Sequence, residues 1–228
     1  MMLAGPETEV DSVLRVLLVE DHPMMRQGIR AVLEQEADMQ LCGEADTADS
    51  ALERIESDPP DLVIIDLSLK GRSGLDLIRN IRDRWPNLAT LVLSMHSESA
   101  YAERALRSGA RGYVTKSEPS ERLIECIRAV RQGKICVGEG FADHMLCRIV
   151  EGQNGAGVLV NRLSDREFEV FELIGQGRST RDIGKQLHIS VKTVDAHREH
   201  IKQKLGLRNA TELLTYAIRW NQLEQDGA

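Results

Sequence analysis

Three carboxylates follow apolar runs near the start of the chain. Glu20 and Asp21 come directly after the run 13–19, and Asp66 directly follows the run 62–65. Carboxylates that converge on one place repel one another unless a cation neutralises them. A hard divalent ion with oxygen ligands, most naturally Mg²⁺, suits such a group. The three residues therefore predict a metal site if the fold brings the two runs together.

Two further polar residues stand at the ends of later apolar runs. Ser94 follows the run 91–93, and Lys116 follows the run 112–115. An ammonium group and a hydroxyl beside a metal-bound carboxylate can hold a phosphoryl group. Asp66 is then the expected nucleophile, and the metal and Lys116 would stabilise charge on the transferred group. Alone, an Asp after a strand is usually a cap or turn former and a Lys is solvated, so the prediction depends on all five positions together.

The elements that would position these residues alternate regularly through the first 130 residues. Strands are predicted from apolar runs at 13–19, 62–65, 91–93 and 112–115, and weak alternation at 39–45 predicts a fifth, edge strand. Helical spacing of apolar residues predicts helices at 23–36, 48–57, 74–84, 98–108 and 120–132. This alternation indicates an α/β fold, a five-stranded doubly wound parallel sheet, with strand order 2-1-3-4-5. Ligands bind such a sheet where the strand order reverses, between strands 1 and 3, and these are the strands that carry the acids.

The composition is that of a foldable protein outside the membrane. The 228 residues are 42% hydrophobic and 29% charged, which argues against wholesale disorder. No stretch approaches the roughly 20 apolar residues of a spanning helix, and the start of the chain does not read as a secretory signal, so we expect a cytoplasmic location. The cysteines have apolar neighbours and no CxxC pair, which favours buried thiols over a disulfide or a zinc site. They are Cys42, Cys126, Cys136 and Cys147.

The charge divides the chain into two parts. From residue 161 onward there are 11 Lys and Arg against 10 Asp and Glu, whereas the preceding residues hold 18 against 26. The acidic first part is a poor nucleic-acid binder by charge alone. We expect an N-terminal tail at 1–12, a first domain at 13–135, a linker at 136–160 and a second domain at 161–228. Within the linker, a short helix is expected at 140–150 and a flexible stretch at 151–160.

The second domain shows helical patterns and no strand signal. Four helices are predicted, at 164–176, 179–187, 190–205 and 209–223. Ser164 and Glu167 have the spacing of a capping box at the start of the first helix. The second and third helices are joined by a short turn and have helix-turn-helix spacing. The prediction is an all-α, four-helix helix-turn-helix domain.

The third of these helices carries residues suited to the major groove of DNA. Its apolar face comprises Val191, Val194, Ile201 and Leu205. The opposite face has groups that can reach base edges, namely Lys192, Asp195, Ala196 and Glu199. Flanking residues that can reach phosphates are Thr193, His197, Arg198, Lys202 and Lys204. A structural helix bundle has a similar pattern, so these residues alone leave DNA binding and a packing role open.

Four segments of the first domain carry a family resemblance: LLVEDHPMMRQGI, VIIDLSLKGRSGLDLI, LVLSMHSE and GARGYVTKS. In order and spacing they resemble the receiver domain of bacterial response regulators, over 14–132. The resemblance implies that Asp66 accepts a phosphoryl group from a sensor histidine kinase. It also implies a Mg²⁺ site made by Glu20, Asp21, Asp66 and the backbone carbonyl of Ser68.

The same resemblance assigns roles to residues at the later strand ends. Ser94 and Lys116 would contact the phosphoryl group, and Tyr113 matches an aromatic switch position three residues before the lysine. We also expect Ser68 and His96 to border the path of the water that removes the phosphoryl group.

Two segments of the second domain are LSDREFEVFELIGQGRSTRDIGKQL and VKTVDAHREHIKQKLGLRNATEL. They resemble the LuxR-type helix-turn-helix domain of NarL/FixJ-type regulators. The resemblance implies a transcriptional regulator that binds double-stranded DNA. Phosphorylation is then expected to change the receiver surface, favour a homodimer and tighten binding to DNA with two half-sites. No membrane partner is expected.

Two other classes of protein fit parts of the pattern. A haloacid-type phosphatase also uses an aspartyl nucleophile, but it needs a second Asp two residues on, where this chain has Ser68. A receiver that ignores phosphate and works through protein contacts would not need the complete set of pocket residues. We therefore expect no enzyme activity beyond slow self-dephosphorylation. Lys70, where the receiver family often has proline, is expected to alter loop stiffness rather than abolish the site.

Overall fold

The structure, a computed structural model, describes most of the chain. The described residues are 13–69, 73–138, 140–141, 159–160 and 162–226. Several expectations therefore lie outside them, namely the tail at 1–12, Lys70, nearly all of the linker helix at 140–150, and the stretch 151–158.

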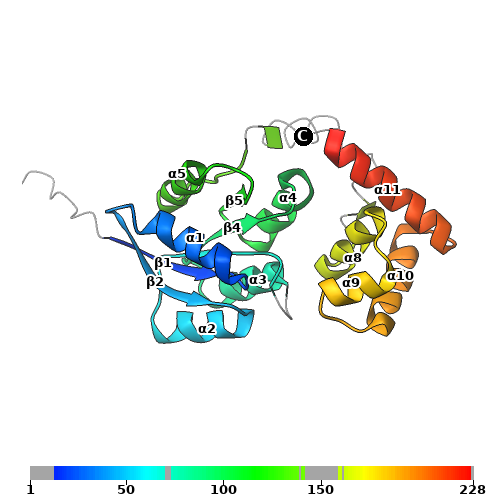
Figure 1. Cartoon of the computed structure of the whole chain (residues 1–228), viewed down its shortest axis with the longest axis horizontal. Coiled ribbons are helices and arrows are strands. Elements are labelled where there is room, and N and C mark those ends of the chain that lie inside the picture. Colours follow the sequence, from blue (N-terminus) through cyan, green and yellow to red (C-terminus); the bar gives the residue numbers. More distant parts are fainter. Residues whose placement is uncertain (1–12, 70–72, 139, 142–158, 161, 227–228) are drawn as a thin grey trace, which may run out of the picture.

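A five-stranded parallel sheet forms the centre of the first part of the chain (Figure 1). Its strands are β1 (Leu14–Val19), β2 (Met39–Ala45), β3 (Leu62–Ile65), β4 (Ala89–Ser94) and β5 (Gly112–Thr115). The order is β2-β1-β3-β4-β5 and every neighbouring pair is parallel, which confirms the predicted α/β fold. Val19 of β1 pairs with Ile65 of β3, so Glu20 and Asp66 leave the sheet side by side.

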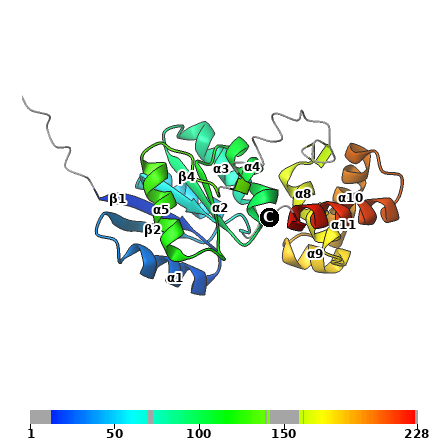
Figure 2. The same cartoon turned by 90° about the horizontal axis from the view of Figure 1, so that it is seen from above.

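Five helices cover the two faces of this sheet (Figures 1 and 2). They are α1 (Pro23–Leu33), α2 (Ala48–Ser57), α3 (Gly74–Arg84), α4 (Glu98–Ser108) and α5 (Ser120–Arg131). Successive strand residues point to opposite faces. Val16 and Leu18 accordingly join the core beneath α1 and α5, whereas Leu17 and Val19 join the core beneath α2, α3 and α4. Burial on both faces is why β3 and β4 have nearly continuous apolar sequences, whereas β2 at the edge of the sheet is only partly buried.

The start of α3 lies against the backbone that follows β3. A Cβ on Gly74 would come within 2.4 Å of the carbonyl oxygen of Asp66 and 2.7 Å of the Cα of Leu67. Ser73 caps the helix, because its hydroxyl accepts the backbone N–H of Leu75. Only glycine fits this approach, so the packing of α3 helps to fix the backbone at Asp66.

The cysteines at the end of the first part depart from the prediction. Cys126 and Cys136 form a disulfide with their Cα atoms 5.4 Å apart, so the expectation of free thiols is wrong for this pair. Cys136 lies in a segment that pairs with β5, where the backbone N–H of Tyr113 donates to the carbonyl of Cys136 at 2.9 Å. The chain thus folds back on the sheet after α5 and brings the two cysteines together. Cys42 is free, and Cys147 lies outside the described residues.

The second part of the chain is helical, as predicted. Its helices are α8 (Asp165–Gly175), α9 (Thr180–Gln186), α10 (Val191–Leu205) and α11 (Ala210–Asp226). The predicted capping box is present: the Ser164 hydroxyl accepts the backbone N–H of Glu167, and the Glu167 carboxylate accepts that of Ser164. The predicted apolar face of α10 is wrong at Val191. This first residue of the helix is 48% exposed, because it precedes the turns of α10 that pack against the rest of the domain. No helix in the described ranges is long and apolar enough to cross a bilayer.

The two parts are in direct contact through α8, which faces α3 and α4 (Figures 1 and 2). Phe168 of α8 is buried between Tyr101 of α4 and Trp220 of α11, with ring centroids 5.0 and 5.2 Å away. The guanidinium of Arg104 lies over the same Phe168 ring at 4.0 Å. The core beneath α2, α3 and α4 therefore continues into the core of the helical part.

Candidate functional site: an acidic pocket and an exposed helix

The strand order brings the predicted acids and the predicted lysine together. Lys116 Nζ lies 2.8 Å from Asp66 Oδ2 and 2.6 Å from Glu20 Oε2. Lys116 also donates its backbone N–H to the carbonyl of Ser94 at 2.8 Å. Since β4 separates β5 from β3, the long lysine side chain is what allows a residue at the end of β5 to reach Asp66. The three contacting side chains are almost fully buried.

Four side chains form an acidic group that suits a cation. Ligand atoms of Glu20, Asp21, His22 and Asp66 all lie within 4.8 Å of one another. The three carboxylates are buried and His22 is exposed. Oxygen ligands of this kind are those that Mg²⁺ prefers, so the donor set fits that ion. The sequence reasoning missed His22, whose Nδ1 lies 3.1 Å from Glu20 Oε1 and 2.7 Å from Asp21 Oδ1, although it directly follows both acids.

Lys116 provides positive charge within this group. Burial alone would lower the pKa of Lys116, but the carboxylates of Asp66 and Glu20 outweigh burial and raise the pKa above its ordinary value. The lysine therefore remains an ammonium group. One ammonium faces three carboxylates, so the pocket keeps a net negative charge that a divalent cation would offset.

A second set of contacts links Asp66 to the outer strands. The backbone N–H of Ser68 donates to Asp66 Oδ1 at 3.2 Å, and Ser68 Oγ lies 3.1 Å from His96 Nε2. The buried Ser94 hydroxyl accepts the backbone N–H of His96 at 3.3 Å. The Tyr113 hydroxyl donates to the carbonyl of His96 at 3.0 Å, and burial raises the pKa of Tyr113, which keeps it protonated. Ser68, Ser94 and Tyr113 thus each contact His96, through its side chain or its backbone.

The residues predicted to reach base edges lie on an exposed surface of α10, which packs on α8 and α9 through its other side. The exposed residues are Lys192, Asp195, Ala196 and Glu199. Thr193 is also exposed, and its Oγ1 lies 2.8 Å from Ser190 Oγ at the start of the helix. Lys202 forms an ion pair with Glu199 at 2.9 Å. This exposed surface has the mixed polarity of a helix that enters the major groove.

Two of the remaining predicted phosphate contacts, Lys204 and Arg198, are paired with neighbouring helices. Lys204 Nζ pairs with Glu167 Oε2 of α8 at 2.6 Å, and Arg198 donates to Thr180 Oγ1 of α9 at 3.2 Å. His197 is half-buried, and burial lowers its pKa. These three side chains therefore lie on the side of α10 that faces the rest of the helical part. Lys192 and Thr193, at the start of α10, are instead exposed to solvent.

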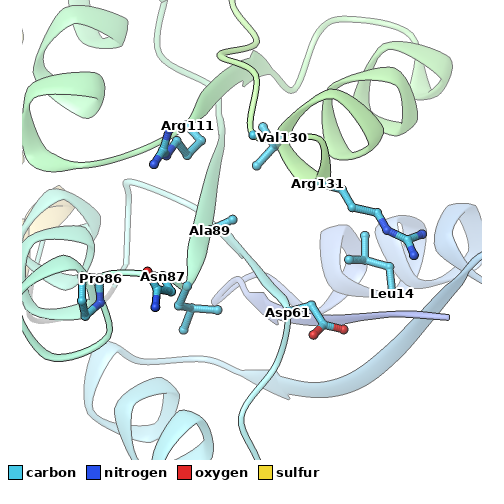
Figure 3. A pocket seen from close by; sticks show the side chains of 10 residues that line it. Leu14, Asp61, Pro86, Asn87, Ala89, Arg111, Val130 and Arg131 are labelled. Atoms are coloured by element: carbon cyan, nitrogen blue, oxygen red, sulfur yellow. The ribbon is translucent and has the colours of Figure 1, made fainter. Parts of the chain in front are cut away.

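An open pocket of about 360 Å³ lies at the opposite edge of the sheet from the acidic group (Figure 3). Leu14 and Asp61, near the amino ends of β1 and β3, contribute to its lining. Figure 3 shows the side chains of Arg111 and Arg131 pointing in different directions, so their charges do not converge on one ligand. The pocket is separate from the acidic group and has no donor arrangement comparable with it.

Family profiles match both parts of the chain. The profile described as "Response regulator receiver domain" matches residues 16–128, and "Bacterial regulatory proteins, luxR family" matches residues 161–217. Fold, acidic group and profiles together define a response regulator, in which a receiver domain is joined to a helix-turn-helix DNA-binding domain.

Relatives that match along their whole length have the same organisation. The chain is 32% identical over 216 residues to the oxygen regulatory protein NreC of Staphylococcus haemolyticus (strain JCSC1435), covering 92% of this chain and 100% of the relative. It is 33% identical to NreC of Staphylococcus aureus (strain MRSA252), with the same coverage. The chain belongs to the two-component response regulators of the NarL/FixJ type, which carry a LuxR-type helix-turn-helix domain.

Solved structures of such regulators are also similar to this chain. RcsB from Salmonella enterica serovar Typhimurium, bound to promoter rprA in the presence of the phosphomimetic BeF3⁻, aligns with a TM-score of 0.60 at 28% identity, covering 90% of this chain and 98% of that chain. A LuxR-family two-component response regulator from Aurantimonas sp. SI85-9A1 aligns with a TM-score of 0.57 at 34% identity, covering 61% of this chain and 99% of the other. The family is one of DNA-binding transcription regulators, not of classical enzymes.

Proposed function

We propose that this regulator is controlled by phosphorylation of Asp66, which accepts the phosphoryl group of a sensor histidine kinase. The observation that carries the proposal is the buried Lys116 ammonium, which contacts both Asp66 and Glu20 at the carboxyl edge of the sheet. In the transfer, an Asp66 oxygen bonds to phosphorus while the N–P bond of the kinase phosphohistidine breaks, and its electron pair returns to the imidazole. Lys116 is placed to donate to a phosphoryl oxygen and to stabilise its charge.

A Mg²⁺ ion is part of this proposal. Glu20, Asp21, Asp66 and the backbone carbonyl of Ser68 would hold it, and the clustered carboxylate oxygens support this assignment. When bound, the ion would neutralise the carboxylates and stabilise charge on the phosphoryl oxygens. The Ser68 N–H meanwhile keeps one oxygen of Asp66 in a fixed orientation.

Ser94 and Tyr113 are the proposed switch residues. A phosphoryl group on Asp66 adds oxygens that attract the Ser94 hydroxyl as well as Lys116. Since that hydroxyl now accepts from His96, its movement would loosen the His96 backbone to which Tyr113 also donates. The change would spread to α4, because Tyr101 of this helix stacks on the His96 ring. Slow loss of the phosphoryl group to water would return the receiver to its resting state.

The output we propose is binding of α10 to double-stranded DNA by a homodimer that spans two half-sites. The receiver domain would comprise 13–135 and the DNA-binding domain 161–228, joined by 136–160, and the protein would act in the bacterial cytoplasm, where the DNA lies. Bases would be contacted by Lys192, Asp195, Ala196 and Glu199. The phosphate backbone would be contacted by Thr193, His197, Arg198, Lys202 and Lys204. The DNA-bound RcsB structure at 28% identity supports this use of the fold.

Intact mass after incubation with acetyl phosphate and Mg²⁺ tests the phosphorylation site. One added phosphoryl group on the wild type and none on Asp66→Asn is the expected result. Some receivers accept a phosphoryl group only from their kinase and would give no adduct with acetyl phosphate. For that case, binding of the phosphoryl mimic beryllofluoride is measured by fluorescence. The modified protein should then bind a two-half-site DNA more tightly than the unmodified protein, and Lys192→Ala should weaken that binding. Absence of both the adduct and beryllofluoride binding would refute the proposal and favour control through protein contacts.

A further inference from the structure

Glu172 of the DNA-binding domain reaches into the receiver domain. It lies on α8, is buried, and places Oε2 3.4 Å from His96 Nδ1. The same oxygen accepts the hydroxyl of Tyr101 at 2.6 Å. The His96 ring also packs on the ring of Tyr101, with centroids 4.3 Å apart. The imidazole is therefore held in place by a carboxylate from one domain and an aromatic ring from the other.

The opposite nitrogen of His96 faces the proposed phosphorylation site. Nε2 lies 3.1 Å from Ser68 Oγ, and the Ser68 N–H donates to Asp66 Oδ1 at 3.2 Å. Contacts thus run without interruption from Glu172 through His96 and Ser68 to Asp66. The sequence separation between Glu172 and Asp66 exceeds 100 residues, so only domain docking joins them.

We propose that Glu172 is a positioning residue for the phosphoryl chemistry of Asp66: it holds the His96 ring beside Ser68, where the ring narrows the path of the hydrolytic water. This inference rests on the proposed function and adds a regulator of the same site. In the hydrolysis, the water oxygen bonds to phosphorus and the bond from phosphorus to the Asp66 oxygen breaks. The products are inorganic phosphate, the free carboxylate and a proton released to solvent.

The physical reason is the loss of freedom of the imidazole side chain. A histidine side chain in a surface loop, such as the segment between β4 and α4, samples several rotamers when it is unrestrained. In the docked structure the side chain of His96 is only 22% exposed, with Glu172 on one nitrogen and Ser68 at the other. Removal of the carboxylate frees the ring to turn outward, and water then reaches the phosphoryl group more often. The DNA-binding domain would thereby lengthen the life of the phosphorylated state while it is docked.

The half-life of the phosphorylated full-length protein tests this inference. The protein is loaded with acetyl phosphate and Mg²⁺, desalted, and followed by intact mass. Glu172→Ala and His96→Ala should each shorten the half-life about three- to tenfold, the range expected for loss of one buried hydrogen-bonded contact. The double variant should match His96→Ala alone, because Glu172 acts through that ring. Glu167→Gln, which removes another buried carboxylate of α8 that pairs with Lys204 and not with His96, should stay within about twofold of wild type.

A general loss of folding stability would change the half-lives in a different pattern from the one expected here. Additive effects of Glu172→Ala and His96→Ala, or an unchanged half-life in Glu172→Ala, would overturn the inference while leaving the proposed function intact. Arg104→Ala, which removes a different contact between the domains, offers a second route: it should shorten the half-life as much as Glu172→Ala. A wild type that takes up neither a phosphoryl group nor beryllofluoride would refute the proposed function, and this inference with it.

Discussion

Replacement of Arg104 by alanine should release the DNA-binding domain from the receiver domain. The Arg104 guanidinium donates to the carbonyl oxygens of Val160 at 2.6 Å and Leu163 at 3.0 Å, just before α8. It also lies 4.0 Å from the centre of the Phe168 ring. The side chain is buried in the contact between the domains, so it makes these interactions away from bulk water.

The magnitude follows from these contacts. Each hydrogen bond from a charged donor contributes about 1.5 kcal/mol, and a desolvated cation–π contact contributes about 1 kcal/mol. Their loss amounts to about 4 kcal/mol, on the order of 1,000-fold in the docking equilibrium. Asp165 is not left without a partner in the variant, because Arg79 contacts its other carboxylate oxygen. The effect should therefore fall on docking, with little added cost from an unpaired buried charge.

Hydrogen–deuterium exchange measures the release. Peptides of α4 and α8 should exchange faster in Arg104→Ala, and small-angle scattering should give a larger radius of gyration. Arg107→Ala is the matched control, since Arg107 lies on the same helix, is mostly exposed and pairs with Glu103 of that helix. This i,i+4 pair lies within one helix and does not cross to the DNA-binding domain, and pairs of this kind contribute about 0.3–0.5 kcal/mol, so docking in the control should be that of the wild type. Equal exchange of α8 in Arg104→Ala and wild type would refute the assigned role of this contact.

Three further predictions concern stability. Gly74→Ala should lower the free energy of unfolding by about 2 kcal/mol, because its Cβ would meet the Asp66 carbonyl oxygen at 2.4 Å. Gly28→Ala, inside α1 with open space around it, should instead raise stability by about 0.5–1 kcal/mol. Urea unfolding measures both, and a Gly74→Ala variant as stable as wild type would contradict the close approach of α3. Without reductant, Cys136→Ala should cost about 3 kcal/mol, the chain entropy of a closed loop of about ten residues. Dithiothreitol should bring the wild type to the stability of this variant, whereas no response of the wild type to reductant would show that the pair carries thiols.

The regular elements and most of the acidic pocket follow from sequence patterns. Apolar runs predicted four of the strands, weak alternation predicted the edge strand at 39–45, and helical spacing predicted the helices that cover them. The pocket residues stand at the ends of those runs, so the parallel order of the sheet is enough to assemble them. The chemistry of a side chain and its position relative to the end of a strand are local properties that involve only a few neighbouring residues. Such properties can be read directly from a sequence.

Contacts that depend on where the chain turns back, or on how the two domains dock, could not be predicted in this way. The pairing of Cys126 with Cys136 depends on the return of the chain beside β5, for which no periodic pattern exists. The neighbours of His96 on α8 belong to a different domain. Val191 fits the apolar stripe of α10 by spacing, but its exposure depends on where the packed turns of the helix begin.

By itself, the sequence determined the α/β sheet, the helical second part and the identity of the residues that meet in the acidic pocket, because each depends on local periodicity or on residue type. Tertiary structure alone decided that Lys116 reaches Glu20 as well as Asp66, because the side chain crosses a strand. It also decided that α8 rests on α4 with Glu172 beside His96, because docking is set by the complementary shape and charge of two surfaces and not by the order of residues within either one.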